Sequence, residues 1–119
     1  MTILKLTRKR VLIDVDTQRD LFIADGAACI RNHRRVLVNI RRIMAWARAV
    51  GIHVVSTAQV NKAPKLNYCL EGTDGAAKIH YTLLNRRTCF AADGYTDLPR
   101  EFFHDHDQMV LCKRSFDPF

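Results

Sequence analysis

The sequence has 119 residues, of which 48% are hydrophobic, and a formal net charge of +7. This length allows one domain with its own core, near the lower limit for a three-layer α/β domain. The apolar runs are far shorter than the ~20 residues that a membrane span needs, and the basic start is not followed by a signal-peptide core. We therefore expect a single domain over residues 1–119, a cytoplasmic location and no membrane partner.

Residues 10–16 have the pattern of a buried strand that runs directly into acidic and polar residues. Successive side chains of a strand point to opposite faces, so Asp14 and Asp16 are expected to share one face, with Asp16 at the mouth. Ligands of open α/β sheets bind beyond the carboxyl ends of the strands, where a desolvated carboxylate can be tuned for acid-base chemistry. The alternative for either acid is a helix cap or an ion pair with an arginine.

Residues 32–50 have apolar side chains at helical spacing, and residues 52–57 follow as a second strand. Gly51 separates the two, as expected of a glycine that ends a helix. A strand, a helix and a strand in this order predict a βαβ unit with two parallel strands. The apolar stripe of the helix consists of Val36, Ile40, Ile43, Met44, Ala47 and Val50.

Five arginines of this helix fall opposite the apolar stripe, and they carry much of the net charge. We interpret them as a solvated face, because aromatic residues do not interleave with them and no DNA- or RNA-binding motif is visible. We therefore predict that nucleic acid is not a partner, and a basic nucleic-acid-binding protein stays as an alternative. These arginines are Arg34, Arg35, Arg41, Arg42 and Arg48.

Residues 58–99 are rich in turn signals and predict loops, residues 99–104 predict a short helix, and residues 108–112 predict a third strand. Parallel strands end at the same edge of a sheet, so the third strand brings Lys113 to the edge where Asp16 lies. Neighbouring strands are ~4.8 Å apart, which puts a carboxylate one or two strands away within reach of a lysine. An ion pair between Asp16 and Lys113 is expected, and a surface lysine is the alternative.

Metal and thiol chemistry have weak signals in this sequence. Residues 104–107 read His-Asp-His-Asp, which we interpret as a solvated polar loop rather than a metal site. His53 and His80 are isolated and are interpreted as structural. The cysteines lack the CxxC spacing of zinc and redox sites, so reduced thiols are expected. They are Cys29, Cys69, Cys89 and Cys112.

Three segments together resemble one family. Residues 16–20, Asp-Thr-Gln-Arg-Asp, are similar to the Asp-x-Gln-x-Asp signature of the isochorismatase-like cysteine hydrolases. Residues 71–75, Glu-Gly-Thr-Asp-Gly, resemble the Gly-Thr-x-Gly element of that family, and residues 113–119 resemble its segment of a lysine followed closely by phenylalanine. The three segments have the order found in the family and span essentially the whole sequence.

The resemblance implies a three-layer α/β/α doubly wound parallel sheet and hydrolysis of a small amide, imide or related substrate by an Asp-Lys-Cys triad. Asp16 would be the general base, and Lys113 would stabilise its carboxylate and the thiolate. Gln18 and Phe119 would contact the substrate. The cysteine of the family lies beyond a fourth strand, well after the lysine, and has no counterpart in these residues.

The sequence departs from the family in two respects that carry further predictions. It reads as a partial domain that stops after the third strand, which leaves an apolar sheet edge and favours a homo-oligomer or, as an alternative function, an inactive binding or assembly module. Members that resemble nicotinamidases carry an Asp-x-His metal pair after the second strand, where this sequence has Gln59-Val60-Asn61. We therefore predict no metal, no cofactor and a substrate other than nicotinamide.

Overall fold

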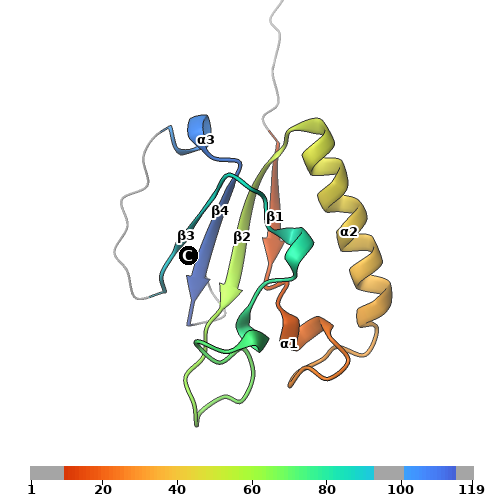
Figure 1. Cartoon of the computed structure of the whole chain (residues 1–119), viewed down its shortest axis with the longest axis vertical. Coiled ribbons are helices and arrows are strands. Elements are labelled where there is room, and N and C mark those ends of the chain that lie inside the picture. Colours follow the sequence, from red (N-terminus) through yellow and green to blue (C-terminus); the bar gives the residue numbers. More distant parts are fainter. Residues whose placement is uncertain (1–9, 93–100, 115–119) are drawn as a thin grey trace, which may run out of the picture.

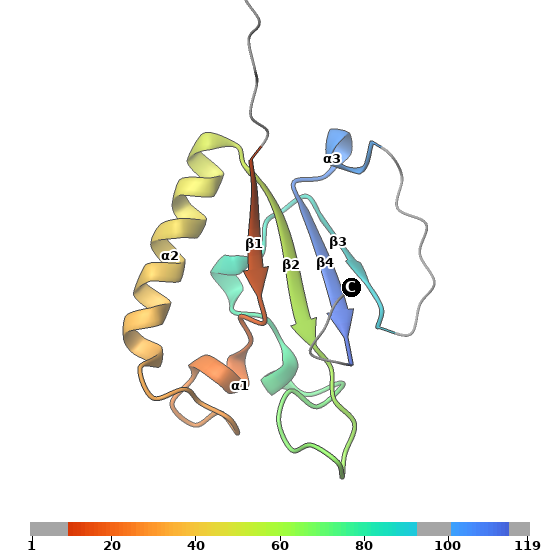
Figure 2. The ribbon, with the colours of Figure 1, turned by 180° about the vertical axis from the view of Figure 1, so that it is seen from behind.

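Four parallel strands form one sheet, and a long helix lies along it (Figures 1 and 2). The computed structural model describes residues 10–92 and 101–114. The strands in spatial order are β1 (Val11–Val15), β2 (His53–Gln59), β4 (Gln108–Lys113) and β3 (Arg87–Phe90). The helices are α1 (Arg19–Phe22), α2 (His33–Val50), α3 (Phe102–Asp105) and the 3₁₀ turns η1 (Asp74–Ala76) and η2 (His80–Thr82). The predicted α/β class with a parallel sheet is confirmed.

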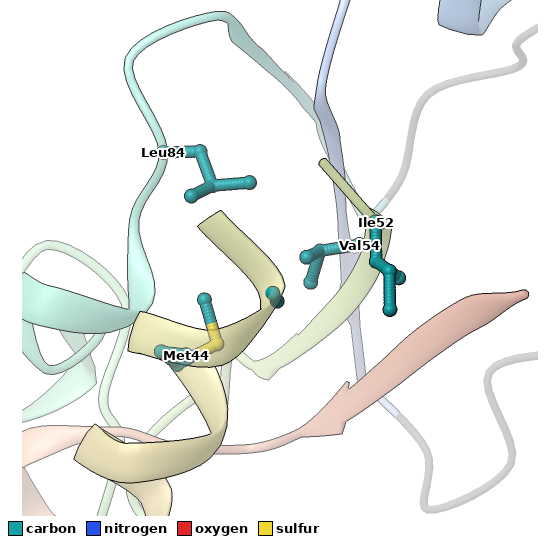
Figure 3. Close-up of a cluster of buried hydrophobic side chains, with 5 residues drawn as sticks. Met44, Ile52, Val54 and Leu84 are labelled. Carbon is teal, nitrogen blue, oxygen red and sulfur yellow. The ribbon is translucent and has the colours of Figure 1, made fainter. Parts of the chain in front are cut away.

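Helix α2 connects β1 to β2, and its apolar stripe supplies the core. It ends where predicted, because Gly51 adopts the left-handed conformation at φ 75° and donates its backbone N–H to the carbonyl of Ala47. The core cluster joins α2 to β2 and to the segment before β3 (Figure 3). Its buried members are Met44, Ala47, Ile52, Val54 and Leu84. No helix in the described part of the chain is long and apolar enough to cross a membrane.

Strand β3 lies in the segment that the sequence predicted as loop. It pairs in parallel with β4, which runs between β2 and β3. Only Cys89 and Phe90 of its four residues, Arg-Thr-Cys-Phe, are apolar, so the segment has too little alternation to reveal a strand. The hydrogen-bonding partner comes about twenty residues later in the sequence, and tertiary pairing therefore creates this strand.

Strand β1 is an edge strand with one open face. Val11, Ile13 and Val15 are 47%, 54% and 60% exposed, and they point away from α2. On this face the described residues contribute the one-turn helix α3, whose Phe103 stacks on His53 at the start of β2. Of the three predicted layers, residues 10–92 and 101–114 form the sheet and the helical layer on the α2 side. Strand β1 lies at the edge of this sheet with exposed apolar side chains, as predicted.

Candidate functional site

Asp16 and Lys113 meet at the carboxyl edge of the sheet, as predicted. Lys113 Nζ lies 3.0 Å from Asp16 Oδ2, although β2 separates the strands that carry the two residues. The hydroxyl of Thr57 donates to Asp16 Oδ1 over 2.8 Å. The lysine side chain is 6% exposed and the aspartate side chain 20%, so the aspartate carboxylate is the accessible half of a mostly buried pair.

Lys113 is held from β2 as well as from Asp16. Gln59 is its neighbour in the parallel register, and Lys113 donates to Gln59 Oε1 over 2.8 Å. The sequence missed Gln59 and Thr57 as members of this site. Both stand in the last three positions of β2, and parallel strands end together, so the register is the signal that could have found them.

Asp16 turns its side chain to the opposite face from Asp14, which corrects the expectation that the two share a face. The strand ends at Val15, and Asp16 takes the left-handed conformation at φ 53°, which aspartate tolerates better than most residues. Its backbone N–H still donates to the carbonyl of Thr57 over 3.1 Å. This turn of the backbone directs the carboxylate toward Lys113.

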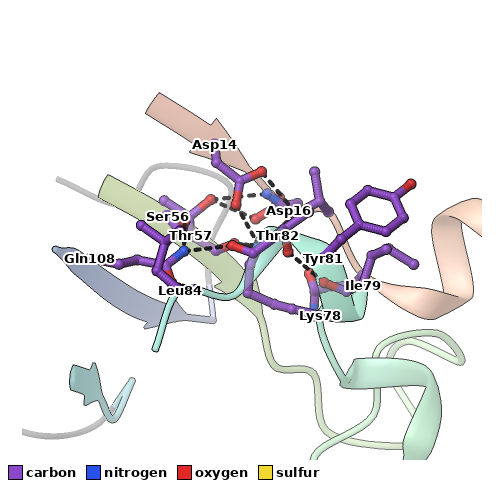
Figure 4. A network of polar contacts seen from close by, with 12 residues as sticks. Asp14, Asp16, Ser56, Thr57, Lys78, Ile79, Tyr81, Thr82, Leu84 and Gln108 are labelled. Carbon is purple, nitrogen blue, oxygen red and sulfur yellow. Dashed lines mark hydrogen bonds and ion pairs between the residues drawn. The ribbon is translucent and has the colours of Figure 1, made fainter. Parts of the chain in front are cut away.

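Asp14 forms a second, buried ion pair with Lys78 on the α2 side of the sheet (Figure 4). Lys78 Nζ lies 3.0 Å from Asp14 Oδ2 and donates hydrogen bonds to Thr17 Oγ1 and to the carbonyl of Thr57. The ammonium group has three N–H donors, and its 3.0 Å contact with Asp14 Oδ2 combines charge attraction with hydrogen bonding. Burial lowers the pKa of Lys78, while the carboxylate of Asp14 acts in the opposite direction. An ion pair with an arginine was the alternative that the sequence offered for Asp14, and the sequence did not identify Lys78.

Gln18 is completely buried and crosslinks backbone segments. Its Nε2 donates to the carbonyls of Gln59 and Ala76, and its Oε1 accepts the N–H of Gln59. Each end of the amide is thus engaged by the protein and fixes the segment after β1 against the end of β2. Contact between Gln18 and a substrate stays a prediction. Phe119, the other predicted substrate contact, lies outside the described residues.

Asp20 anchors the turn-rich segment below the site. Its Oδ1 accepts the N–H of Ala27, and its Oδ2 accepts the N–H of Cys69 over 2.8 Å. A Cβ on Gly75 would overlap this carboxylate, so the close approach requires glycine. Two of the three segments that carry the family resemblance, residues 16–20 and 71–75, are therefore packed against each other.

The amides of Gln59 and Asn61 do not fit a metal ion. Gln59 Nε2 donates to Asn61 Oδ1 over 2.7 Å, and Gln59 Oε1 accepts from Lys113. Both amide oxygens are thus occupied by hydrogen bonds within the protein. In residues 10–92 and 101–114 no three His, Cys, Asp or Glu side chains gather closely enough to hold a metal. The absence of a metal from the working protein stays a prediction.

The side chains of residues 104–107 have separate partners rather than a shared site. His106 stacks on Phe102 with ring centroids 4.4 Å apart, and Asp107 forms a bidentate pair with Arg86. His104 lies 3.9 Å from a carboxylate oxygen of Glu101 at the surface. His104 and Asp105 belong to α3 rather than to a loop, and the partners of His104, His106 and Asp107 differ, so these three side chains do not converge on one site.

Cys69 and Cys112 are not placed as activated nucleophiles beside Asp16. Cys69 has no exposed surface, and burial, together with the charges of Asp20 and Asp16, raises its pKa to about 11. Cys112 precedes Lys113 on β4 and points to the other face, and burial raises its pKa too. A thiol is nucleophilic as the thiolate, so a raised pKa disfavours the reactive form of both residues.

The fold resembles that of several solved structures. Pyrazinamidase of Pyrococcus horikoshii in complex with zinc matches 94% of this chain at 19% identity and a TM-score of 0.59. Nicotinamidase from Bacillus subtilis matches 94% at 16% identity and 0.63, and an isochorismatase family protein from Desulfovibrio vulgaris matches 95% at 20% identity and 0.63. No protein-family model matches the sequence, and no curated protein does.

The chain therefore has the isochorismatase-type α/β fold, over part of that fold. It spans 55%, 59% and 56% of the lengths of these three structures, respectively. The sequence identity is low, so the likeness concerns the fold and leaves the activity to be argued from the site.

Proposed function

We propose that Asp16 and Lys113 are the general base and the electrostatic partner of a cysteine hydrolase centre for a small amide, imide or related substrate. This proposal rests on the 3.0 Å ion pair at the carboxyl edge of the sheet, in which Asp16 is more exposed than Lys113. Asp16 would accept the thiol proton, and the sulfur would then attack the substrate carbonyl carbon and form an S–C bond. Transfer of that proton to the departing nitrogen and hydrolysis of the thioester by water complete the cycle.

The thiol of this centre comes, in this proposal, from polypeptide outside the 119 residues. Cys69 is buried and protonated, Cys112 faces away from Lys113, and the fold neighbours extend well beyond the part that this chain matches. Lys113 would hold Asp16 and stabilise the thiolate through its charge. Gln18 and Phe119 remain the proposed substrate contacts.

Rescue by an added thiol tests the role of Asp16. The 119-residue chain would be mixed with p-nitrophenyl acetate and 2-mercaptoethanol, and release of p-nitrophenolate would be followed against thiol concentration. We expect the chain to accelerate the thiol-dependent reaction and Asp16→Asn to abolish the acceleration, because the base is then lost. Asp107→Asn removes a carboxylate at the far end of β4 and is the matched control. Equal rates for the wild type and Asp16→Asn, with both folded by circular dichroism, would refute the proposal.

An assembly module without catalysis is the second candidate, and the open face of β1 favours it. Val11, Ile13 and Val15 are exposed apolar side chains on a strand at the edge of the sheet, and such a strand is a template for pairing with another chain. This candidate predicts a homo-oligomer whose formation depends on these three residues and is indifferent to Asp16.

A further inference from the structure

The positive charge of the protein is concentrated on one helix. Residues 31–50 hold six arginines and no Asp or Glu, which gives this segment +6, whereas the whole chain has +7. The remaining residues therefore sum to +1. Figures 1 and 2 show α2 at the flank of the sheet, with its outer side away from the other described elements. A polyanion is the class of partner that this distribution fits.

Two of the helix arginines are engaged by the protein itself. Arg48 donates to the carbonyls of Tyr81 and Leu83, and the Arg41 guanidinium lies 6.0 Å from the centre of the Tyr81 ring. These contacts dock the η2 segment against the helix. Both residues are exposed, as the sequence interpretation of a solvated face expects, but these contacts occupy their guanidinium groups, so a partner is sought at the other arginines.

Arg10 and Arg42 lie beside an exposed aromatic ring of α2. Trp46 is 46% exposed, and the guanidinium carbon of Arg10 lies 5.9 Å from its ring centre. Arg35 and Arg42 precede Trp46 by eleven and four residues, so the three side chains lie along one side of the helix over about 16 Å. The sequence argument against nucleic acid was the lack of an aromatic residue among the arginines, and Trp46 supplies it.

We propose that the outer side of α2 binds single-stranded nucleic acid, with a base stacked on Trp46 and phosphates paired with Arg10, Arg34, Arg35 and Arg42. We call this surface the basic face. Single strands are held by a positive track combined with aromatic side chains on which unpaired bases stack. Arginine also suits phosphate, because its guanidinium can donate two parallel hydrogen bonds. The surface is separate from Asp16 and Lys113, so this binding is independent of the hydrolase proposal.

A single strand fits this surface better than an anionic membrane. The centre of the apolar stripe of α2 packs against the sheet through Met44 and Ala47, which are 2% and 1% exposed, whereas Ile43 and Val50 at its edge are 46% and 51% exposed. A helix that lies in a membrane needs its apolar face free to enter the acyl boundary. Trp46 instead presents an exposed ring beside Arg10 and Arg42, and an accessible aromatic ring next to cations is what stacking on an unpaired base requires.

The fluorescence of Trp46 reports binding directly, since it is the only tryptophan of the chain. The 119-residue protein would be titrated with a 12-nucleotide oligothymidine at several salt concentrations. We expect quenching of Trp46 and, for about four phosphate contacts, a slope of roughly −3 in log K against log salt concentration. Trp46→Ala is expected to weaken binding at least about fivefold, measured by anisotropy of a labelled oligonucleotide.

A charge-matched pair of variants separates the basic face from net charge. Arg35→Gln/Arg42→Gln should reduce the salt slope to about half, because two of four phosphate contacts are lost. Lys62→Gln/Lys65→Gln removes the same charge from exposed positions after β2 and should leave the slope unchanged. Circular dichroism confirms that each variant is folded.

Several outcomes would overturn this proposal. They are absence of quenching at low salt, equal weakening by the arginine and the lysine pairs, and binding of a duplex as tight as that of the single strand. Binding to vesicles of phosphatidylcholine with phosphatidylserine is measured as well. Binding to these vesicles without binding to the oligonucleotide would replace the nucleic acid by a membrane surface.

Discussion

Lys78→Met removes one partner of the buried ion pair with Asp14 and tests how much that pair stabilises the fold. Both side chains are 5% exposed, and Lys78 Nζ also donates to Thr17 and to the carbonyl of Thr57. Removal of one partner of a buried pair costs about 3–5 kcal/mol, because the remaining charge has no compensation. We expect a loss of this size in the free energy of unfolding, a large part of the 5–15 kcal/mol that is typical of a domain.

The double variant Asp14→Leu/Lys78→Met distinguishes an uncompensated charge from lost packing. Apolar replacement of both members of a buried pair is often neutral or stabilising by about 1–4 kcal/mol. The hydroxyl of Thr17 and the carbonyl of Thr57 lose a donor in both variants, and the double variant also removes Asp14 Oδ1, the acceptor of the Thr17 hydroxyl, at a cost of about 1–3 kcal/mol. The double variant should therefore be more stable than Lys78→Met alone, with a coupling energy of about 3 kcal/mol or more.

Urea denaturation at pH 7 measures both changes. The transition would be followed by the fluorescence of Trp46 and by far-ultraviolet circular dichroism, and coincident transitions justify a two-state treatment. A Lys78→Met variant within about 1 kcal/mol of the wild type would refute the reasoning, because a cost that small belongs to exposed pairs. The same conclusion follows if the double variant is no more stable than the single one.

Four further outcomes are expected. Gly75→Ala places a methyl group on the carboxylate of Asp20 and should destabilise the fold by about 1–3 kcal/mol, and an unchanged melting temperature would contradict this. Because the pKa of Cys69 is raised to about 11, its thiolate fraction at pH 8 is about a hundredfold below that of an ordinary thiol, so a disulfide reagent should label exposed Cys89 first and Cys69 only after unfolding. The raised pKa also means that the folded state loses stability as pH rises from about 9 to about 11. Ile13→Lys should abolish self-association through β1 in size-exclusion chromatography, and an unchanged elution volume of an oligomer would exclude that edge.

The elements that the sequence predicted have a strong periodic signal of their own. The pattern of residues 32–50 and the glycine after it predicted α2 to within one residue, because both the buried stripe and the cap are local. Strands β1, β2 and β4 are apolar runs long enough to be recognised. Strand β3 and the one-turn helix α1 have four residues each, and their structure depends on partners elsewhere in the chain.

The parts of the site whose position follows from the sheet topology could be predicted from the sequence. The side-chain orientation that depends on a single backbone angle could not. The pairing of Asp16 with Lys113 follows from parallel strands that end together. Asp14 and Asp16 face opposite sides of the sheet because Asp16 has a left-handed backbone conformation, and the strand pattern in the sequence does not predict that conformation. Lys78 lies in an irregular segment more than sixty residues after Asp14, so no spacing rule connects the two.

Thr57 links the two ion pairs through the sheet, which gives the buried pair a role in positioning Asp16. Its carbonyl accepts a hydrogen bond from Lys78 on one face, and its hydroxyl donates to the carboxylate of Asp16 on the other. The backbone N–H of Asp16 donates a hydrogen bond to the same carbonyl. The end of β2 therefore fixes both the backbone and the side chain of the proposed base. Because Lys78 holds that end of β2 from behind, loss of Lys78 should disturb the Asp16–Lys113 pair before it unfolds the domain.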